Sequence, residues 1–111
     1  MSDPKPNNDS NPQSAVRNPQ STKAARRYIV RGRVQGVGFR WYVERVAASL
    51  GLAGYVKNQY NGDVEVYAIG APEALDAMRR SLERGPRGAR VTEVRESPAA
   101  FEDCRSFRIA F

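Results

Sequence analysis

Alternating apolar and polar residues predict five β-strands along this chain. The clearest alternation runs from residue 27 to residue 34, where Tyr28, Val30, Gly32 and Val34 share one face and Arg27, Ile29, Arg31 and Arg33 share the other. A period of two residues is typical of a strand with one buried face. The same pattern predicts strands over residues 53–58, 63–69, 90–96 and 106–111.

Two of these strands carry expectations about which side chains are buried. In residues 63–69, the pattern predicts that Val64, Val66 and Ala68 face the core, and that Glu65, Tyr67 and Ile69 face away from it. In residues 106–111, Phe107, Ile109 and Phe111 share one face. The pair Asn61-Gly62 lies between two predicted strands and is a strong signal for a tight hairpin turn.

Helical periodicity marks two further segments. Apolar residues recur at spacings of three and four over residues 38–50, and Gly51 follows as a C-terminal cap. A second helix is expected to begin near Pro72, which suits a first helical turn, and the pair Gly85-Pro86 ends it. The acidic residues of this helix come early and its arginines come late, which complements the helix dipole.

The predicted order is strand, helix, strand, strand, helix, strand and a short terminal strand. This is the α+β, ferredoxin-like split βαβ sandwich, βαββαβ plus one strand. We expect two helices on one face of an antiparallel sheet, with the other face open to water. The fold alone leaves the function open, because this architecture serves enzymes, metal carriers and RNA-binding proteins.

Residues 1–24 differ in composition from the rest. They carry four of the seven prolines and are mostly Asn, Ser, Gln and Asp. Such a segment buries too little apolar surface to offset the entropy of ordering. The composition therefore predicts a disordered polar N-terminal tail, followed by one folded domain over residues 25–111.

Composition and charge restrict the chemistry. The chain has no histidine, which excludes histidine-based general-base catalysis and most zinc sites. Its single cysteine forms no intrachain disulfide, which fits a reducing compartment. No segment has the length of a membrane span and the N-terminus lacks the apolar core of a signal peptide, so we expect a cytoplasmic protein. The net charge of +6 indicates anionic partners.

The segment VQGVGFR, residues 34–40, joins the first predicted strand to the first predicted helix. It lacks the third glycine of a dinucleotide fingerprint and the Gly-Lys-Ser/Thr of a Walker A loop. Gly36 and Gly38 still allow successive backbone N–H groups to point inward at a helix N-terminus, where an anion binds well. Arg40 in the first turn adds a planar set of donors that matches a phosphoryl group or a carboxylate.

The simpler interpretation is a tight turn with a surface ion pair between Arg40 and Glu44. A cation is disfavoured at a helix N-terminus, however, so its presence favours an anion site. Asn58 ends the predicted strand 53–58 and is expected to lie near this loop. Its residue type is equally typical of a turn.

Two segments, VRGRVQGVGFR and GYVKNQYNGDVEVYAIG, resemble the two signature segments of the acylphosphatase family. The first, residues 30–40, fits throughout. The second fits at Gly54, Val56, Lys57, Asn58, Gly62, Val64 and Gly70, with the spacing intact. The similarity extends over about residues 26–111.

This resemblance implies hydrolysis of acyl phosphates to a carboxylate and inorganic phosphate. It implies that Arg40 binds the phosphoryl group with the backbone N–H groups of Gln35, Gly36, Val37, Gly38 and Phe39, and that Asn58 positions the attacking water. It implies no metal and no organic cofactor. We expect a monomer that takes a small acyl phosphate, is inhibited by inorganic phosphate, and binds neither a specific nucleic acid nor a membrane.

Two other functions remain open at this stage. Tyr and Arg or Lys side chains on an open sheet face are how RNA-recognition folds stack bases, although Glu65 on the same face weakens this reading. A phosphate-binding loop could also serve a small-anion sensor without turnover. Cys104 lies between Asp103 and Arg105 in a loop and is expected to be a bystander rather than a nucleophile.

Overall fold

The computed structural model describes residues 23–111, and every predicted helix and strand is present. The elements are β2 (Ala24–Arg33), α1 (Phe39–Leu50), β3 (Ala53–Asn58), β4 (Val64–Gly70), α2 (Pro72–Arg84), β5 (Arg90–Pro98) and β6 (Phe107–Ala110). The first strand begins at Ala24, three residues before its predicted start. Of the predicted tail over residues 1–24, only Lys23 and Ala24 belong to the described residues, and residues 1–22 lie outside them.

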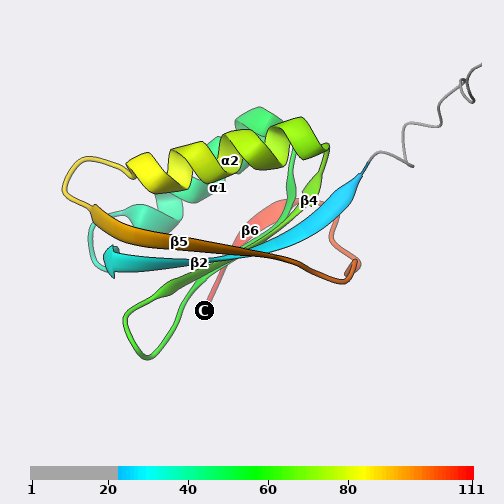
Figure 1. Ribbon diagram of the computed structural model, residues 1–111. Helices are drawn as coiled ribbons and strands as arrows, with labels where there is room; N and C mark the ends of the chain where they lie inside the picture. The colour runs from blue at the N-terminus through cyan, green and yellow to red at the C-terminus, as the bar shows by residue number, and fades with distance from the viewer. Residues whose placement is uncertain (1–22) are drawn as a thin grey trace, which may run out of the picture.

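The strands form one sheet in the order β5-β2-β4-β3-β6, and both helices pack on one of its faces (Figure 1). Within this sheet β2 pairs antiparallel with β4 and β5, and β3 pairs antiparallel with β4. These four strands with two helices on one side are the predicted ferredoxin-like arrangement. The expected α+β fold is therefore confirmed.

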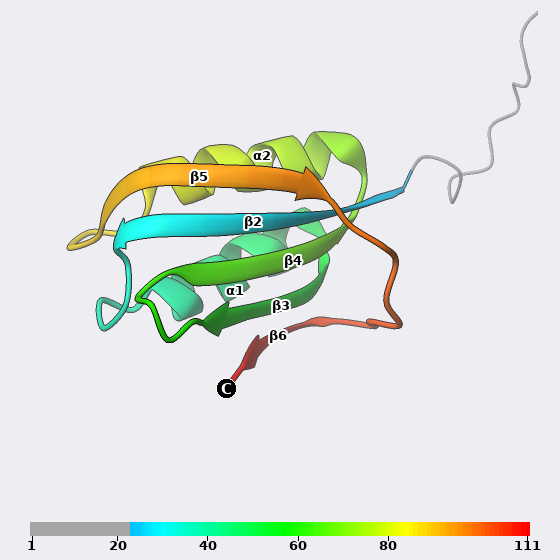
Figure 2. The same cartoon turned by 60° about the horizontal axis from the view of Figure 1, so that its bottom comes forward.

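The fifth strand corrects the prediction of a wholly antiparallel sheet. β6 adds to the edge of the sheet and pairs in parallel with β3, with Gly54 opposite Phe107 and Lys57 opposite Ala110. Figure 2 shows the physical reason: the chain leaves β5 at one end of the sheet, passes around that end, and meets β3 where β3 begins. From that end β6 can only run in the direction of β3.

The core lies between the sheet and the two helices. The strands contribute Tyr28, Val30, Val56, Val64 and Val66, while α1 contributes Phe39, Val43 and Ala47 and α2 contributes Leu75, Met78 and Leu82. The Tyr28 hydroxyl donates a hydrogen bond to the Leu75 carbonyl oxygen over 2.9 Å. Burial raises the pKa of Tyr28 to about 12, so this donor keeps its proton at physiological pH.

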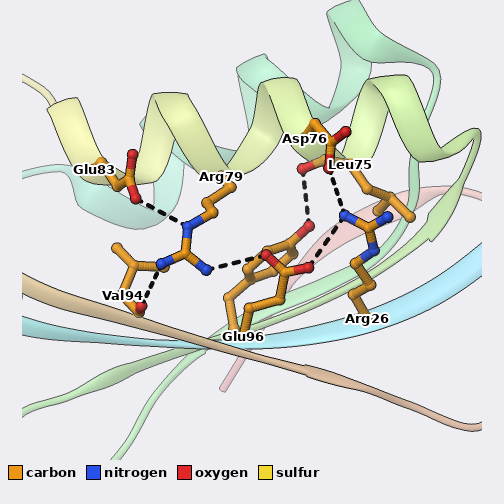
Figure 3. A network of polar contacts seen from close by, with 8 residues as sticks. Arg26, Leu75, Asp76, Arg79, Glu83, Val94 and Glu96 are labelled. Carbon is orange, nitrogen blue, oxygen red and sulfur yellow. Dashed lines mark hydrogen bonds and ion pairs between the residues drawn. The ribbon is translucent and has the colours of Figure 1, made fainter.

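A polar network ties α2 to the sheet beside this core (Figure 3). Arg26 on β2 lies 2.7 Å from Asp76 on α2 and 3.1 Å from Glu96 on β5. Arg79 on α2 reaches the same Glu96 at 3.1 Å and donates to the Val94 carbonyl oxygen over 2.9 Å. Because Glu96 is shared by both arginines, the network fixes how α2 lies across β2 and β5.

The second sheet face is partly covered, which corrects the prediction that Tyr67 is exposed. Tyr67 lies on the predicted face, where its ring stacks on Tyr55 at 5.5 Å, but it has no exposed surface. Its hydroxyl donates to the Ala100 carbonyl oxygen over 2.6 Å and accepts from the Glu102 N–H over 2.8 Å. The β5–β6 connection, residues 99–106, therefore packs over Tyr67 and covers part of this face.

Candidate active site

The glycine loop brings a helix N-terminus to one end of the sheet, the end where β3 and β4 also meet (Figure 2). Gly36 and Gly38 have φ values of 75° and 73°, and Gly38 caps α1. These left-handed conformations are the ones that glycine adopts at little cost, as the sequence predicts. The backbone N–H groups of residues 36–39 donate to none of the loop, turn or cap carbonyl oxygens within residues 23–111. They therefore remain available to an anion.

The side chain of Gln35 connects this loop to the β3–β4 turn. Its amide nitrogen, Nε2, donates to the carbonyl oxygens of Gln59 and Asp63, each over 2.8 Å. These two carbonyls lie at the start and end of the turn. The sequence predicts only a backbone role for Gln35, whereas its side chain holds together the two segments that make the site.

Arg40 is the second residue of α1 and is half-buried. Among the described residues, Arg40 forms no ion pair with Glu44 or with any other carboxylate, so the surface pair considered from the sequence is not formed. Its guanidinium carbon lies 5.2 Å from the centroid of the Phe111 ring, which is 96% exposed. The first turn of α1 has no acidic residue either. The positive charge of Arg40 is therefore left for an anion to meet.

Asn58 is the last residue of β3 and lies opposite Val64 in the sheet. Its side-chain oxygen, Oδ1, is buried and has no hydrogen-bond partner among the described residues. The bonds that shape the β3–β4 turn come from other residues: the Gln59 N–H donates to Asp63 over 2.9 Å, and Asn61 Oδ1 accepts from the Asp63 N–H over 3.0 Å. A buried acceptor without a partner is costly and calls for a donor that binds there.

Arg40 and Asn58 come together around one cavity of about 220 Å³, lined by Val34, Gly36, Gly38, Phe39, Arg40, Trp41 and Asn58. Of these lining residues, Arg40 is the only ionisable one. The side chains of two predicted loop residues lie elsewhere: that of Val37 packs on the hydrophobic core, and Gln35 lines an adjoining groove. The cavity is small and positively charged and is bordered by Asn58, whose buried Oδ1 lacks a partner among the described residues, which suits a phosphoryl group and a water.

The adjoining groove has a volume of about 650 Å³ and shares Asn58 with the cavity. It is lined by Gln35, Lys57, Asn58, Gln59, Tyr60, Glu65 and Phe111. Glu65 accepts hydrogen bonds from Arg27 over 2.9 Å and from Tyr55 over 3.0 Å. Burial pushes the pKa of Glu65 upward, but these hydrogen bonds outweigh burial and hold the pKa below its usual value. Glu65 is therefore a paired carboxylate and a poor general base.

Sequence reasoning missed two aromatic neighbours of this site. Trp41 lines the cavity, yet in the sequence it appears only as the residue that replaces the third glycine of a dinucleotide motif. Phe111 was expected to continue the last strand, but the strand ends at Ala110 and Phe111 instead contacts Arg40. The position of Trp41 directly after Arg40 was the available signal for Trp41. The proximity of Phe111 to Arg40 is revealed only by the pairing of β6 with β3.

The alternative sites are less favourable. Tyr67, which an RNA-binding face would need exposed, is buried. Cys104 is free, half-buried and part of the β5–β6 connection. In residues 23–111, no three or more His, Cys, Asp or Glu side chains are grouped so that they could hold a metal ion. Over the same residues no helix has the length and apolar character to cross a membrane.

Comparison with known proteins gives consistent matches. The family model described as Acylphosphatase matches residues 26–109. The chain is 52% identical over 89 residues to an acylphosphatase of Koribacter versatilis strain Ellin345, covering 79% of this chain and 81% of that protein. The structure is similar to that of an acylphosphatase from Coxiella burnetii, with a TM-score of 0.79 and 35% identity over 82% of this chain and 96% of the other. A Bacillus subtilis acylphosphatase structure gives a TM-score of 0.76 at 38% identity, covering 78% of this chain and 98% of the other.

Proposed function

The chain belongs to the acylphosphatase family, and from this premise we propose that the cavity between the glycine loop and β3 is the site where it hydrolyses acyl phosphates. Hydrolysis of the carboxyl–phosphate bond is the activity that goes with the family. The proposal assigns this activity to Arg40, Asn58 and the loop backbone of residues 35–39. The proposed products are a carboxylate and inorganic phosphate, which is also the expected competitive inhibitor.

The observation that carries the proposal is the orphaned oxygen of Asn58. It is buried and lacks a partner among the described residues, and Asn58 is one of the residues that line the same cavity as Arg40. A water bound there donates one hydrogen to Oδ1 and directs an oxygen lone pair into the cavity. The amide thus orients the attacking water, a role for which position matters more than basicity.

Arg40 and the loop amides bind the phosphoryl oxygens in this proposal. The guanidinium offers several donors in one plane, and the left-handed conformations of Gly36 and Gly38 are the kind that turn successive backbone amides toward a bound anion. The transition state of phosphoryl transfer spreads negative charge over the equatorial oxygens, and fixed donors stabilise this charge without reorganising. Arg40 therefore acts in both substrate binding and catalysis.

The bond changes need no strong acid or base from the protein. The water oxygen forms a bond to phosphorus as the bond from phosphorus to the acyl oxygen breaks, and that electron pair leaves with the carboxylate. A carboxylate is a good leaving group, so it leaves unprotonated. The water proton passes to a phosphate oxygen, since Arg40 is the only ionisable residue that lines the cavity and a guanidinium has donors but no acceptor.

We further propose that the protein acts as a monomer, because Arg40, Asn58 and the loop backbone suffice for the proposed chemistry without a residue from a second copy. A cytoplasmic location accords with a single cysteine, because disulfides are rare in reducing compartments. The role is tested by following acetyl phosphate hydrolysis with and without EDTA. We expect turnover in both conditions and competitive inhibition by inorganic phosphate. Absence of turnover, or purely noncompetitive inhibition, would contradict the proposed site.

A further inference from the structure

Trp41 is placed at the cavity but is not needed for packing. The core-facing side of α1 is formed by Phe39, Val43 and Ala47, whereas Trp41 is 65% exposed and lies outside the hydrophobic core. It nevertheless lines the cavity that holds Arg40 and Asn58. A large aromatic side chain that is exposed beside a binding cavity offers a flat apolar surface to whatever enters there.

The chemistry of phosphoryl transfer indicates what that surface meets. The attacking and leaving oxygens lie roughly in line through the phosphorus. In the proposed function the water is held by Asn58 at the end of β3, so the acyl group leaves on the side of the phosphorus opposite Asn58. Among the residues that line the cavity, Trp41 in the first turn of α1 is the one large apolar side chain that is exposed, whereas Val34 and Phe39 are buried.

We propose that Trp41 forms the acyl-group subsite and gives the enzyme a preference for acyl phosphates with an aromatic or flat apolar acyl group. The inference rests on the proposed function, because it takes the phosphoryl position from Arg40 and Asn58. The indole stacks on the acyl group and leaves the phosphoryl contacts unchanged. Trp41 is thus a specificity-determining residue, and the adjoining groove, which Asn58 also lines, is left as the route for water.

Kinetics with two substrates test this subsite. Benzoyl phosphate and acetyl phosphate share the reacting group and differ in the acyl group. For Trp41→Ala we expect the ratio of kcat/KM for benzoyl over acetyl phosphate to fall about tenfold, the effect of one lost stacking contact. Inhibition by inorganic phosphate stays unchanged, and Trp41→Phe keeps most of the preference. The matched control is Phe101→Ala, which removes another aromatic that is 63% exposed but does not line the cavity.

A binding measurement separates this inference from the proposed function. Trp41 is the only tryptophan in the chain, so the protein's indole emission reports directly on the subsite. Phenacylphosphonate, in which CH₂ replaces the bridging oxygen of benzoyl phosphate, should shift this emission, while acetonylphosphonate and inorganic phosphate should shift it little. An enzyme that turns over both substrates but shows an unchanged ratio in Trp41→Ala and no selective emission shift would overturn the subsite alone. Absence of turnover with every acyl phosphate would overturn the proposed function, and the emission titration would still decide the subsite.

Discussion

The guanidinium carbon of Arg40 lies 5.2 Å from the centroid of the Phe111 ring, so the residue that follows the edge strand β6 meets the first turn of α1 at the candidate site. A cation over an aromatic face at an exposed position contributes about 0.5–1 kcal/mol. We expect Phe111→Ala to raise the inhibition constant for inorganic phosphate by about two- to fivefold, because Arg40 loses a contact that restricts its rotamers. Phosphate inhibition of acetyl phosphate hydrolysis measures this effect.

Phe111→Tyr is the matched control, since it keeps the aromatic face. If Phe111→Ala and Phe111→Tyr have the same inhibition constant for inorganic phosphate, the ring does not hold Arg40 in place. A large fall in thermal stability would point instead to a structural role for Phe111. That result is unexpected for a side chain that is 96% exposed.

The Gln35 side chain gives a second prediction, because it joins the glycine loop to the turn that follows Asn58. Its Nε2 donates to two carbonyl oxygens over 2.8 Å. Gln35→Ala should lower the free energy of unfolding by about 1–2 kcal/mol, as two hydrogen bonds to partly buried carbonyls are lost. It should also lower kcat about tenfold, because the loop and Asn58 no longer hold a fixed separation.

Chemical unfolding and steady-state kinetics on the same preparation test both parts. Gln59→Ala is a useful comparison, since it removes a neighbouring glutamine side chain and leaves the Gln59 carbonyl that Gln35 binds. Loss of stability without any loss of kcat would restrict Gln35 to a structural role.

The paired carboxylate of Glu65 gives a pH prediction. Burial raises the pKa of Glu65, but hydrogen bonds from Arg27, Tyr55 and Gln59 together lower it by more than burial raises it. The folded pKa therefore lies below the ordinary value of 4.5. The unfolded chain then binds a proton at a higher pH than the folded chain does, and stability rises with pH over that interval. The stabilisation by Glu65 is present above about pH 4.5 and is lost as the pH falls through the lower folded pKa.

Urea unfolding of wild type and Glu65→Gln at pH 7 and pH 3 measures this contribution. We expect the variant to be less stable by about 1–3 kcal/mol at pH 7, because it loses charged hydrogen bonds at a largely buried position. The difference should shrink at pH 3, because this pH lies below the ordinary pKa of 4.5 and the unfolded carboxyl is then protonated. An equal difference at both pH values would show that charge is not the cause.

Much of the fold could be predicted from local sequence patterns. The alternation over residues 27–34 and 63–69 and the glycines at 51 and 85 predict elements whose observed ends lie within about three residues of expectation. Local spacing decides such elements because each is stabilised by burying one face of a regular backbone. The positive φ of Gly36 and Gly38 was likewise predictable, since a loop that presents N–H groups at a helix start needs it.

Long-range contacts explain what the sequence did not reveal. Alternation places Tyr67 on the face with Tyr55, but it carries no sign of the hydrogen bonds to Ala100 and Glu102 that bury it. The direction of β6 depends on where the β5–β6 connection crosses the sheet, which a short apolar strand does not encode. At the candidate site, the motifs predict roles for Arg40 and Asn58, while the side-chain contacts of Gln35 and Phe111 depend on the folded arrangement.

Arg40 gives the fourth prediction. In the proposed function it contacts the phosphoryl group in both the ground state and the transition state. Arg40→Ala should therefore weaken phosphate inhibition and lower turnover together, with kcat/KM falling by roughly 10²–10³. Arg40→Lys should restore little, because an ammonium cannot make the planar bidentate contact. Full activity in Arg40→Lys would mean that charge alone is required.

Substitution of Asn58 should change the kinetics in a different way from substitution of Arg40, because in the proposal Asn58 contacts the water rather than the phosphoryl group. Asn58→Ala should lower kcat by roughly 10²–10³ and leave phosphate inhibition nearly unchanged. Asn58→Asp keeps the shape of the side chain but places a negative charge beside an anionic substrate, so it should weaken phosphate inhibition as well. Circular dichroism must first show that each variant is folded, since Asn58 also adjoins the β3–β4 turn. If folded Asn58→Ala keeps a kcat near that of wild type, the orphaned Oδ1 does not position the attacking water and the mechanism proposed for this site is wrong.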